Sequence, residues 1–332
     1  MALLEVKGLK TYFYTYAGVV KAVDGVSFKV NRGEVLGIVG ESGSGKSVTA
    51  LSILRLVQQP GRIIDGQVIF DGIDLLSLTE KEMNAYRGKR IAMVFQDPMT
   101  SLNPTLTVGF HIMEILSRDP NLRTKKQKKA RAIELLKSVG ISEPEKRLNQ
   151  YPYQFSGGMR QRIMIALAIA LNPDLLIMDE PTTALDVTVQ AQIMELVKSI
   201  QRRYHMAIIF ITHDLGVIAG FSDRVMVMYA GRKVEEGDVY DIFEKPLHPY
   251  TQALLSAVLK INMDKTQRLY SIPGSPPNMI VPPPGCRFHP RCSYAMRICA
   301  KEVPELITLN GRGVYCWKVF RELGVIENVR SG

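Results

Sequence analysis

The feature that most constrains this chain is the glycine-rich octet Gly40-Glu41-Ser42-Gly43-Ser44-Gly45-Lys46-Ser47. It fits the pattern G-x-x-x-x-G-K-[ST], in which glycines let backbone N–H groups turn inward around phosphate groups. An apolar strand pattern at 35–39 precedes it, and a helical pattern from 46 to about 57 follows, whose N-terminus adds partial positive charge. The order strand, phosphate loop, helix predicts a nucleotide-binding α/β domain.

Each residue type in the octet has a predicted task. Lys46 is expected to reach the β- and γ-phosphates, and the Ser47 hydroxyl to supply a Mg²⁺ ligand. The candidate nucleotide-binding residues here are Gly40, Ser42, Gly43, Ser44, Gly45, Lys46 and Ser47.

Strand and helix patterns alternate along the rest of the chain. Period-2 patterning predicts strands at 4–7 and 26–30, joined by an aromatic loop from Tyr12 to Tyr16. Residues 79–149 are predicted to be mainly helical, with one helix stopping at Gly140. Buried strands are expected at 175–178 and 207–211, with a helix near 187–204 between them and a hairpin through 230–232 at the sheet edge. This alternation predicts a mostly parallel sheet.

Two acidic residues follow the apolar strand at 175–178. Asp179 stands where a carboxylate can hold the Mg²⁺ shell, and Glu180 where one can orient or deprotonate an attacking water. Acidic pairs after apolar strands are common. Beside a phosphate loop this pair predicts hydrolysis of the bound nucleotide.

Composition bounds the remaining possibilities. At 332 residues, with 46% hydrophobic and 22% charged residues, the chain fits a main domain of about 250 residues with an appendage. The net charge of +10 fits a polyphosphate ligand and an anionic membrane surface better than nucleic acid, because the basic residues are spread out. No apolar run approaches the roughly 20 residues of a membrane span, and no secretory signal is visible, so we expect a cytosolic location.

The segment Phe155-Ser156-Gly157-Gly158-Met159-Arg160-Gln161-Arg162 resembles the signature sequence of ABC transporter ATPases. Phe155 stands where Leu is commoner and Met159 where Gln is commoner, but neither change removes a phosphate donor. In that family Ser156, Gly157 and Gly158 would contact the γ-phosphate bound by another subunit. The resemblance covers essentially the whole chain, and it implies a dimer with two nucleotides in its interface.

Further positions resemble functional residues of the same family. Gln96 corresponds to the glutamine that ligates Mg²⁺ and senses the membrane subunit, Asp186 to the loop that crosses the dimer interface, and His213 to the histidine that contacts the γ-phosphate. An aromatic ring is needed to stack on adenine. Phe13 fits this role best by its spacing from the first strand, with Tyr12, Tyr14 and Tyr16 as competitors.

The composition changes after about residue 245, where prolines accumulate and all four cysteines follow Gly285. The segments 247–251, 272–277 and 284–292 resemble the C-terminal extension of ATP-binding subunits of dipeptide and oligopeptide importers. We therefore expect an ABC-type P-loop NTPase domain at 1–245, with an N-terminal antiparallel β region and a helical subdomain at about 97–160. A small metal-cluster extension is expected at 246–332.

The four cysteines Cys286, Cys292, Cys299 and Cys316 are separated by five, six and sixteen residues. In a reducing cytosol, clustered cysteines favour metal ligation over disulfides. Spacing alone leaves Zn²⁺ and an iron–sulfur cubane open, since no C-x-x-C pair is present. The resemblance to peptide importers implies a [4Fe–4S] cluster with a structural role.

The resemblance also implies a function and partners. The chain would be an ATP-hydrolysing subunit that energises import of di- or oligopeptides, bound peripherally at the cytoplasmic face of the inner membrane. It would form a head-to-tail nucleotide-sandwich dimer with a related ATP-binding subunit or a copy of itself. Two integral permease subunits and an extracytoplasmic peptide-binding protein would complete the complex, docked around Gln96 and residues 97–105.

Two other functions stay open at this point. A nickel importer belongs to the same branch, and residues of this chain do not separate dipeptide, oligopeptide and nickel as cargo. A soluble ABC ATPase of DNA repair or translation is the alternative from another class, although such proteins usually carry two nucleotide sites or long coiled coils. No nucleic acid partner is expected.

Overall fold

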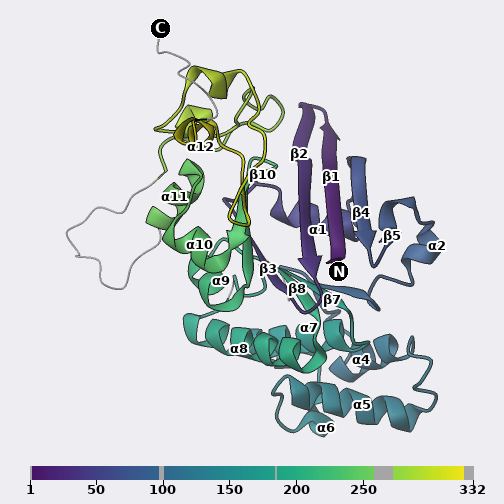
Figure 1. Cartoon of the computed structure of the whole chain (residues 1–332). Helices are drawn as coiled ribbons and strands as arrows, with labels where there is room; N and C mark the ends of the chain where they lie inside the picture. Colours follow the sequence, from purple (N-terminus) through teal and green to yellow (C-terminus); the bar gives the residue numbers. More distant parts are fainter. Residues whose placement is uncertain (1, 97–100, 184, 258–271, 325–332) are drawn as a thin grey trace. The chain divides into compact units, whose positions relative to one another are not determined.

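A computed structural model describes residues 2–96, 101–183, 185–257 and 272–324. The chain forms two compact units (Figure 1). One, here called the phosphate-loop unit, comprises residues 2–30, 35–76 and 211–332, and the other, the helical unit, comprises residues 31–34 and 77–210. Each unit is described by itself.

The phosphate-loop unit contains an antiparallel sheet with the strand order β2-β1-β4-β5. Its strands are β1 (Ala2–Thr15), β2 (Gly18–Asn31), β4 (Gly61–Phe70) and β5 (Ile73–Asp74). The predicted antiparallel region and its two strands are confirmed, but the predicted aromatic loop is wrong. Tyr12 and Phe13 lie within β1 opposite Arg62 and Gly61, because β4 pairs with β1 at these residues.

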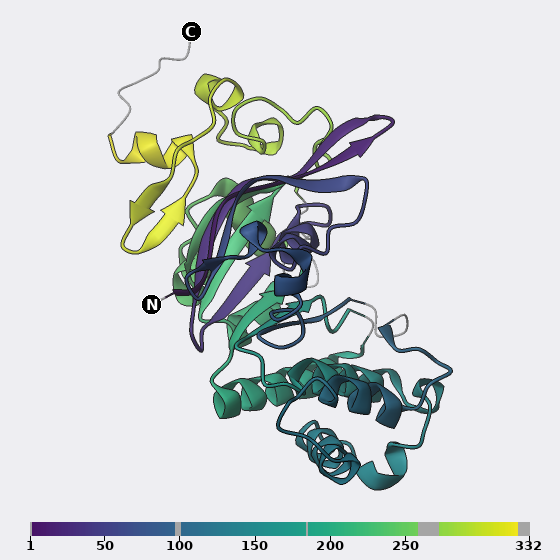
Figure 2. The same ribbon diagram turned by 90° about the vertical axis from the view of Figure 1, so that its right-hand side faces the viewer.

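A second set of strands in this unit has the order β11-β12-β10-β9-β3. The pair β11 and β12 is drawn as yellow arrows in Figure 2. Its strands are β3 (Val35–Val39), β9 (Arg224–Tyr229), β10 (Arg232–Asp238), β11 (Ile307–Leu309) and β12 (Arg312–Val314). Strands β3 and β9 run parallel, whereas β9, β10, β12 and β11 are antiparallel neighbours. The predicted hairpin is confirmed, but its place at the sheet edge is wrong, because β12 pairs with β10.

The helices of this unit are short. They are α1 (Lys46–Ile53), α9 (Leu215–Phe221), α10 (Val239–Glu244), α11 (Pro249–Ser256) and α12 (Trp317–Glu322). Single 3₁₀ turns occur at η1 (Leu75–Ser77), η3 (His289–Arg291) and η4 (Arg297–Ala300). Helix α1 ends before the predicted residue 57, since Arg55 has a left-handed φ of 53°.

The helical unit contains the strands β8-β7-β6, in that order. They are β6 (Ile91–Val94), β7 (Leu175–Asp179) and β8 (Ala207–Ile211), and every residue of β7 and β8 is buried. The prediction of a mainly helical segment at 79–149 missed β6, which pairs with β7 in parallel. Four apolar residues carry too little periodicity to separate a short strand from a helix.

The helices of this unit are α2 (Glu80–Met83), α4 (Val108–Leu116), α5 (Lys125–Ser138), α6 (Pro144–Arg147), α7 (Gly157–Ile169) and α8 (Val187–Tyr204), with a 3₁₀ turn η2 (Pro152–Gln154). The predicted helix at 187–204 is confirmed. So is the stop at Gly140, which follows α5 with a φ of 73°.

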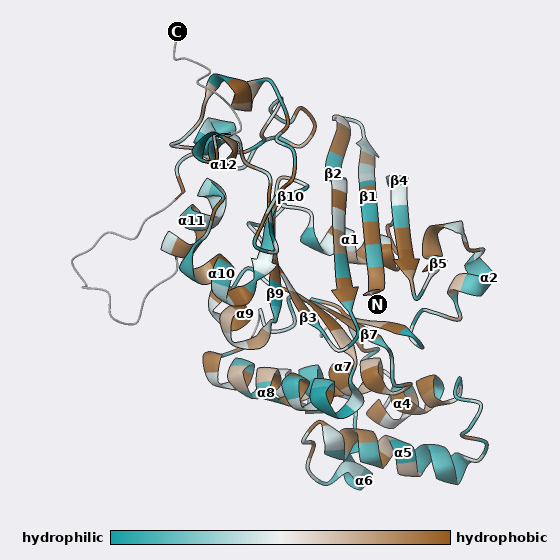
Figure 3. Cartoon of the chain, in the orientation of Figure 1, coloured by the Kyte–Doolittle hydropathy of each residue, from teal (hydrophilic) through white to brown (hydrophobic). Residues whose placement is uncertain are grey.

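The hydropathy of each helix in the helical unit shows which face is packed. Ile193, Val197 and Ile200 recur at helical spacing on α8 and are buried, and the ribbon of α8 carries both brown and teal segments (Figure 3). Among the helices that the structure describes, none is long and apolar enough to cross a membrane.

Candidate active site

The phosphate loop connects the buried strand β3 to α1 in the phosphate-loop unit, as predicted. Two of its glycines are required by their surroundings. A Cβ atom on Gly40, whose φ is +154°, would lie 2.2 Å from the Met228 carbonyl oxygen, and one on Gly45, whose φ is +98°, would lie 2.3 Å from the Ala22 carbonyl oxygen. These contacts fix the tight path that the backbone takes into the helix.

The polar groups of the loop suit a polyphosphate. Lys46 is 5% exposed, and its Nζ donates to the carbonyl oxygens of Gly40 at 2.8 Å and Glu41 at 3.0 Å. The buried Ser44 hydroxyl has no hydrogen-bond partner among the described residues. A buried hydroxyl without a partner is costly, and a phosphate oxygen would satisfy it. The loop therefore fits the nucleotide that its sequence predicts.

The candidate hydrolytic residues Gln96 and Glu180 meet in the helical unit. The Gln96 Nε2 donates to the Glu180 Oε2 at 3.2 Å, and the Thr183 hydroxyl donates to the same oxygen at 3.1 Å. Glu180 adopts a left-handed φ of 46°, a strained conformation that clusters at functional sites. Asp179, the last residue of β7, is buried. Thr183 was not predicted, and only its closeness in sequence to Glu180 indicated it.

The signature segment forms the exposed N-terminus of α7. Ser156 is the N-cap, and its hydroxyl accepts a hydrogen bond from the Met159 N–H at 3.3 Å. The ring of Phe155 is buried, and the Arg147 guanidinium carbon lies 5.8 Å from its centre. Phe155 is thus a packing residue, which leaves the backbone N–H groups at the helix start unaltered.

Three other candidates lie at element boundaries or in strands. Asp186 caps α8 through a 2.9 Å bond from the Val189 N–H. His213 is exposed directly after β8. Phe13 is half-buried against Gly61, whereas the Tyr12 hydroxyl donates to Asp24, and burial raises the pKa of Tyr12 to about 12. Of the competing aromatic residues, Tyr12 is therefore already engaged.

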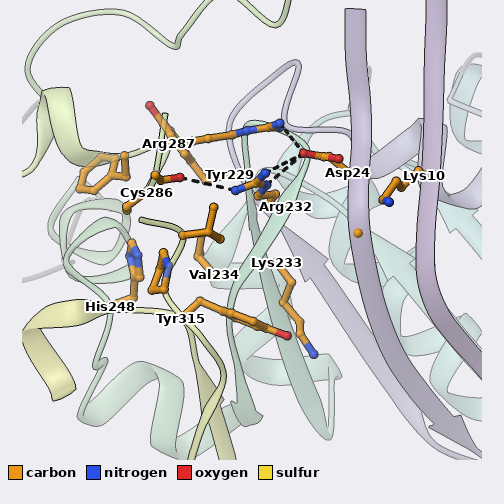
Figure 4. Close-up of a pocket in the computed structure, with 15 residues that line it drawn as sticks. Lys10, Asp24, Tyr229, Arg232, Lys233, Val234, His248, Cys286, Arg287 and Tyr315 are labelled. Carbon is orange, nitrogen blue, oxygen red and sulfur yellow. Dashed lines mark hydrogen bonds and ion pairs between the residues drawn. The ribbon is translucent and has the colours of Figure 1, made fainter. Parts of the chain in front are cut away.

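Two arginines connect the extension to the rest of the phosphate-loop unit, the buried Arg287 and the partly exposed Arg232. Arg287 and Arg232 both donate to the Asp24 carboxylate (Figure 4), and Arg287 also donates to the Ala230 carbonyl oxygen. They line a cavity of about 300 Å³, with His248 on another wall. Burial lowers the pKa of His248 to about 3, so its ring is neutral at physiological pH. The ring Nδ1 caps α11 by accepting a hydrogen bond from the Tyr250 N–H at 3.0 Å.

The cysteines lie near one another, but the structure does not show the predicted metal site. Cys299 and Cys316 are buried, and Cys286 and Cys292 are half-buried. Burial raises the pKa of Cys286 to about 11 and that of Cys316 to about 12, and Cys286 interacts electrostatically with Cys292 and Cys299. Among the described residues, no group of three or more His, Cys, Asp or Glu side chains is arranged to hold a metal ion. The arrangement of the described side chains thus does not support the expected metal-cluster extension.

Sequence reasoning missed two residues that contact the phosphate loop. Arg291 pairs with the Glu41 carboxylate, and the Tyr250 hydroxyl accepts a hydrogen bond from the Glu41 N–H. An arginine between two cysteines was the only signal for the first. No local pattern indicated the second.

Comparison with known proteins agrees with this geometry. The ABC transporter family matches residues 23–183, and the oligopeptide/dipeptide transporter C-terminal region matches residues 234–299. The oligopeptide transport ATP-binding protein OppD of Bacillus subtilis is 54% identical over 309 residues, which are 93% of this chain and 86% of that protein. The dipeptide transport ATP-binding protein DppD of Haemophilus influenzae is 52% identical over 98% of both chains.

The chain belongs to the ATP-binding proteins of oligopeptide/dipeptide ABC transporters. The DppD protein of Escherichia coli is also 51% identical over 95% of this chain and 96% of its own length. As a member of this family, the chain is an ABC ATPase with an α/β nucleotide-binding domain and an antiparallel β-sheet.

Solved structures of ABC ATPases share the fold. A dimeric post-hydrolysis structure of the ATP-binding cassette MJ0796 with ADP and Pi is 29% identical, with a TM-score of 0.64 over 71% of this chain and 98% of that one. The protein cbiO1 from Clostridium perfringens, part of the ABC transporter complex cbiONQ, is 26% identical, with a TM-score of 0.63 over 74% of this chain and 91% of that one.

Proposed function

We propose that this ABC ATPase energises the import of di- and oligopeptides through a membrane transporter. The observation that carries the choice of cargo is the C-terminal region at 234–299, which matches the peptide-transporter type and begins in β10, a strand paired with β9 of the phosphate-loop unit. The relatives named as peptide transport proteins extend over nearly the whole chain, which supports the same assignment.

In this proposal the phosphate loop binds ATP. Its backbone N–H groups surround the phosphates, and Lys46 moves from its own loop carbonyls to the β- and γ-phosphates. Ser47, Gln96 and Asp179 would hold the Mg²⁺ that offsets the phosphate charge. Phe13 stacks on the adenine, and His213 contacts the γ-phosphate. The second phosphate-binding end, Ser156 with Gly157 and Gly158, contacts the nucleotide of the partner subunit beside Asp186.

Glu180 is the proposed general base. Its Oε2 already accepts hydrogen bonds from Gln96 and Thr183, which hold the carboxylate in one orientation. The oxygen of the attacking water bonds to the γ-phosphorus while the bond between the γ-phosphorus and the oxygen bridging to the β-phosphate breaks. The proton of the water passes to Glu180. Hydrolysis then reopens a dimer that ATP had closed.

The proposed partners follow from the cargo and from the exposed α7 terminus. A related ATP-binding subunit, or a second copy, forms the nucleotide-sandwich dimer, as the dimeric form of the cassette MJ0796 supports. Two permease subunits and an extracytoplasmic peptide-binding protein complete the transporter, which holds this chain at the cytoplasmic face of the membrane. Of the predicted docking segment 97–105, residues 97–100 lie outside the described residues.

We also propose that the cysteines hold a [4Fe–4S] cluster. Backbone N–H groups bond to the sulfurs of Cys286, Cys292, Cys299 and Cys316, as they do to thiolate ligands. A single tetrahedral Zn²⁺ requires sulfurs about 3.8 Å apart, given Zn–S bonds of about 2.3 Å. Four cysteine thiolates also suit a [4Fe–4S] cluster, which they would hold in this proposal, although among the described residues no group of three or more side chains is arranged for a single ion.

Elemental analysis tests the cluster. Protein purified without oxygen should contain about four irons and four acid-labile sulfides per chain. Zinc without sulfide, or neither element, would reject the cubane and leave the ATPase function untouched.

The function itself is tested by trapping the dimer. Glu180→Gln should bind ATP and accumulate as a closed ATP dimer in the assembled transporter, whereas wild-type protein should turn ATP over faster when peptide-loaded binding protein is added. An ATPase rate that rises with Ni²⁺-loaded binding protein instead would assign the cargo to nickel. Undiminished turnover in Glu180→Gln would remove Glu180 from the general-base role.

A further inference from the structure

The phosphate loop is held from outside by the C-terminal extension, through Glu41. Every polar group of this residue is engaged. Its carbonyl oxygen accepts from Lys46 Nζ at 3.0 Å, its N–H donates to the Tyr250 hydroxyl at 2.9 Å, and its carboxylate pairs with Arg291. Glu41 is the residue between Gly40 and Ser42, so whatever fixes it also fixes the start of the loop.

Arg291 grips the Glu41 carboxylate with both ends of its guanidinium group. Nη1 donates to Oε2 at 2.7 Å and Nη2 to Oε1 at 3.0 Å, a fork-on-fork pair that fixes direction as well as distance. The Arg291 side chain is 6% exposed. Its Nε donates to the Pro273 carbonyl oxygen at 2.9 Å, and Nη1 also reaches the Tyr229 hydroxyl at 3.2 Å. The arginine is therefore itself immobilised before it meets the loop.

Tyr250 provides the second contact from α11. Its side chain is fully buried, with ring centres 4.5 Å from Tyr229 and 5.3 Å from Phe288. Because the ring is packed on two sides, its hydroxyl has a defined position under the Glu41 N–H. This N–H thus points to the extension and not to the phosphates.

The turn between Cys286 and Cys292 carries Arg291 and Phe288 together. The Arg291 N–H donates to the Phe288 carbonyl oxygen at 3.0 Å, and the Cys286 N–H donates to the Cys299 carbonyl oxygen at 2.8 Å. The cysteine-bearing turn and the phosphate loop are therefore connected by a short path, from the turn through Arg291 to Glu41.

We propose that Arg291 and Tyr250 are positioning residues for ATP binding. Through them, the cysteine-bearing extension holds the phosphate loop in place. This inference rests on the proposed role of the phosphate loop in binding ATP. A loop held at both the backbone and the side chain of Glu41 is ordered before ATP arrives. Without these contacts ATP binding must supply the cost of ordering the loop, so affinity falls while the chemical step is unchanged.

This role is separate from simply attaching the extension. Arg287 anchors the same turn elsewhere, to Asp24, as Figure 4 shows, and to the Ala230 carbonyl oxygen. The pairing of β12 with β10 attaches the extension a second time. Loss of the Arg291 and Glu41 pair therefore leaves the extension in place and affects the loop.

The test uses the full-length chain and a fluorescent methylanthraniloyl derivative of ATP, with KM and kcat measured on ATP itself. We expect Arg291→Gln and Glu41→Gln each to raise Kd and KM about tenfold, with kcat at saturating ATP within about threefold of wild type. The double variant should be no worse than either single variant, because both remove one pair. Arg291→Lys should recover part of the affinity, since it keeps the charge but loses the fork.

Two further variants make the test decisive. Tyr250→Phe removes one hydroxyl and keeps the packed ring, so it should raise KM even if Arg291→Gln proves unstable. Arg321→Gln changes an exposed arginine of α12 and should leave KM unaltered. An unshifted KM in both Arg291→Gln and Tyr250→Phe, or multiplicative losses in the double variant, would overturn the proposal. Wild-type protein that neither binds nor hydrolyses ATP would instead refute the proposed function.

Discussion

The two helix N-termini proposed to bind phosphate differ in how they are surrounded. At α1, Ser44 and Lys46 are 3% and 5% exposed, and the N-cap residue Gly45 provides no side-chain cap. At α7, Ser156 and Gly157 are exposed, and Ser156 caps the helix itself. The same chemistry, a helix N-terminus with glycines, is thus enclosed in one place and open in the other.

This difference indicates which end each subunit completes alone. At α1 a Cβ on Gly45 would meet the chain's own backbone at 2.3 Å, whereas at α7 the nearest atom to a Cβ on Gly157 is a Leu185 methyl at 3.5 Å. The α1 end is built and closed by this chain. At the α7 end a Cβ on Gly158 would lie 2.6 Å from Val189 Cγ1, so the open side is at Gly157, where we propose that a partner's nucleotide approaches.

The largest effect is expected from Glu180→Gln, which should lower ATP hydrolysis without weakening ATP binding at α1. Glu180→Gln leaves the α1 end intact, so ATP affinity should stay within about threefold while kcat falls by about 10³, the range for losing a general base. Single-turnover hydrolysis and ATP titration measure the two quantities. Glu195→Gln, an exposed glutamate of α8, is the matched control. A loss in kcat of less than tenfold would contradict the proposal that Glu180 is the general base.

A pair of glycine variants compares the two ends directly. Gly40→Ala should lower the free energy of unfolding by about 1–3 kcal/mol or more, since its φ is +154° and its Cβ would lie 2.2 Å from a carbonyl oxygen. Gly157→Ala should change stability by less than about 1 kcal/mol, yet lower ATP hydrolysis by the dimer. Urea unfolding and ATPase assays test this. Equal losses of unfolding free energy in Gly40→Ala and Gly157→Ala would show that the two helix N-termini are equally enclosed.

Acid should destabilise the part of the extension that contacts the phosphate loop, because His248 caps α11, the helix that carries Tyr250. The pKa of His248 is lowered by burial to about 3, whereas the unfolded value is about 6.5, so below pH 6.5 the unfolded state binds a proton that the folded state does not. Stability is therefore lost as pH falls, by about 2 kcal/mol between pH 6.5 and 5 from this group. His248→Asn keeps an N-cap oxygen and removes the titration. Urea unfolding of both proteins at the two pH values should show a smaller loss for the variant, and the same loss in both would exclude His248 as the cause.

The smallest effect concerns the cap of α7. Ser156→Ala removes the acceptor of the Met159 N–H and should cost about 1 kcal/mol of unfolding free energy. ATP binding to the α1 end of the same chain should be unchanged in the monomer, whereas hydrolysis by the dimer should fall. Thermal unfolding and nucleotide titration check both. Weakened ATP binding in the monomer would show that α7 also serves the chain's own nucleotide.

The parts of the fold that could be predicted are those with local signals. The octet at 40–47 and the helix at 187–204 carry their spacing within one segment, and the structure has α1 and α8 there. The aromatic residues of β1 and the position of β10 were mispredicted because each depends on a distant partner, β4 or β12. Strand pairing at long range leaves little mark on either segment alone.

The candidate site divides in the same way. Gln96 and Glu180 were predicted from separate motifs, and the structure joins them by a hydrogen bond. Arg291 and Tyr250 could not be predicted to meet Glu41, since 250 and 209 residues separate the partners. Motifs identify the groups that act on a ligand, but not the residues that hold those groups in place.

Peptide uptake by reconstituted transporter tests the central claim most directly. Proteoliposomes that contain this chain, its permease subunits and internal ATP would receive binding protein loaded with a labelled di- or oligopeptide outside. We predict that peptide uptake requires ATP and is lost with Glu180→Gln. Absence of uptake, with an ATPase rate that responds to DNA or ribosomes instead, would contradict it.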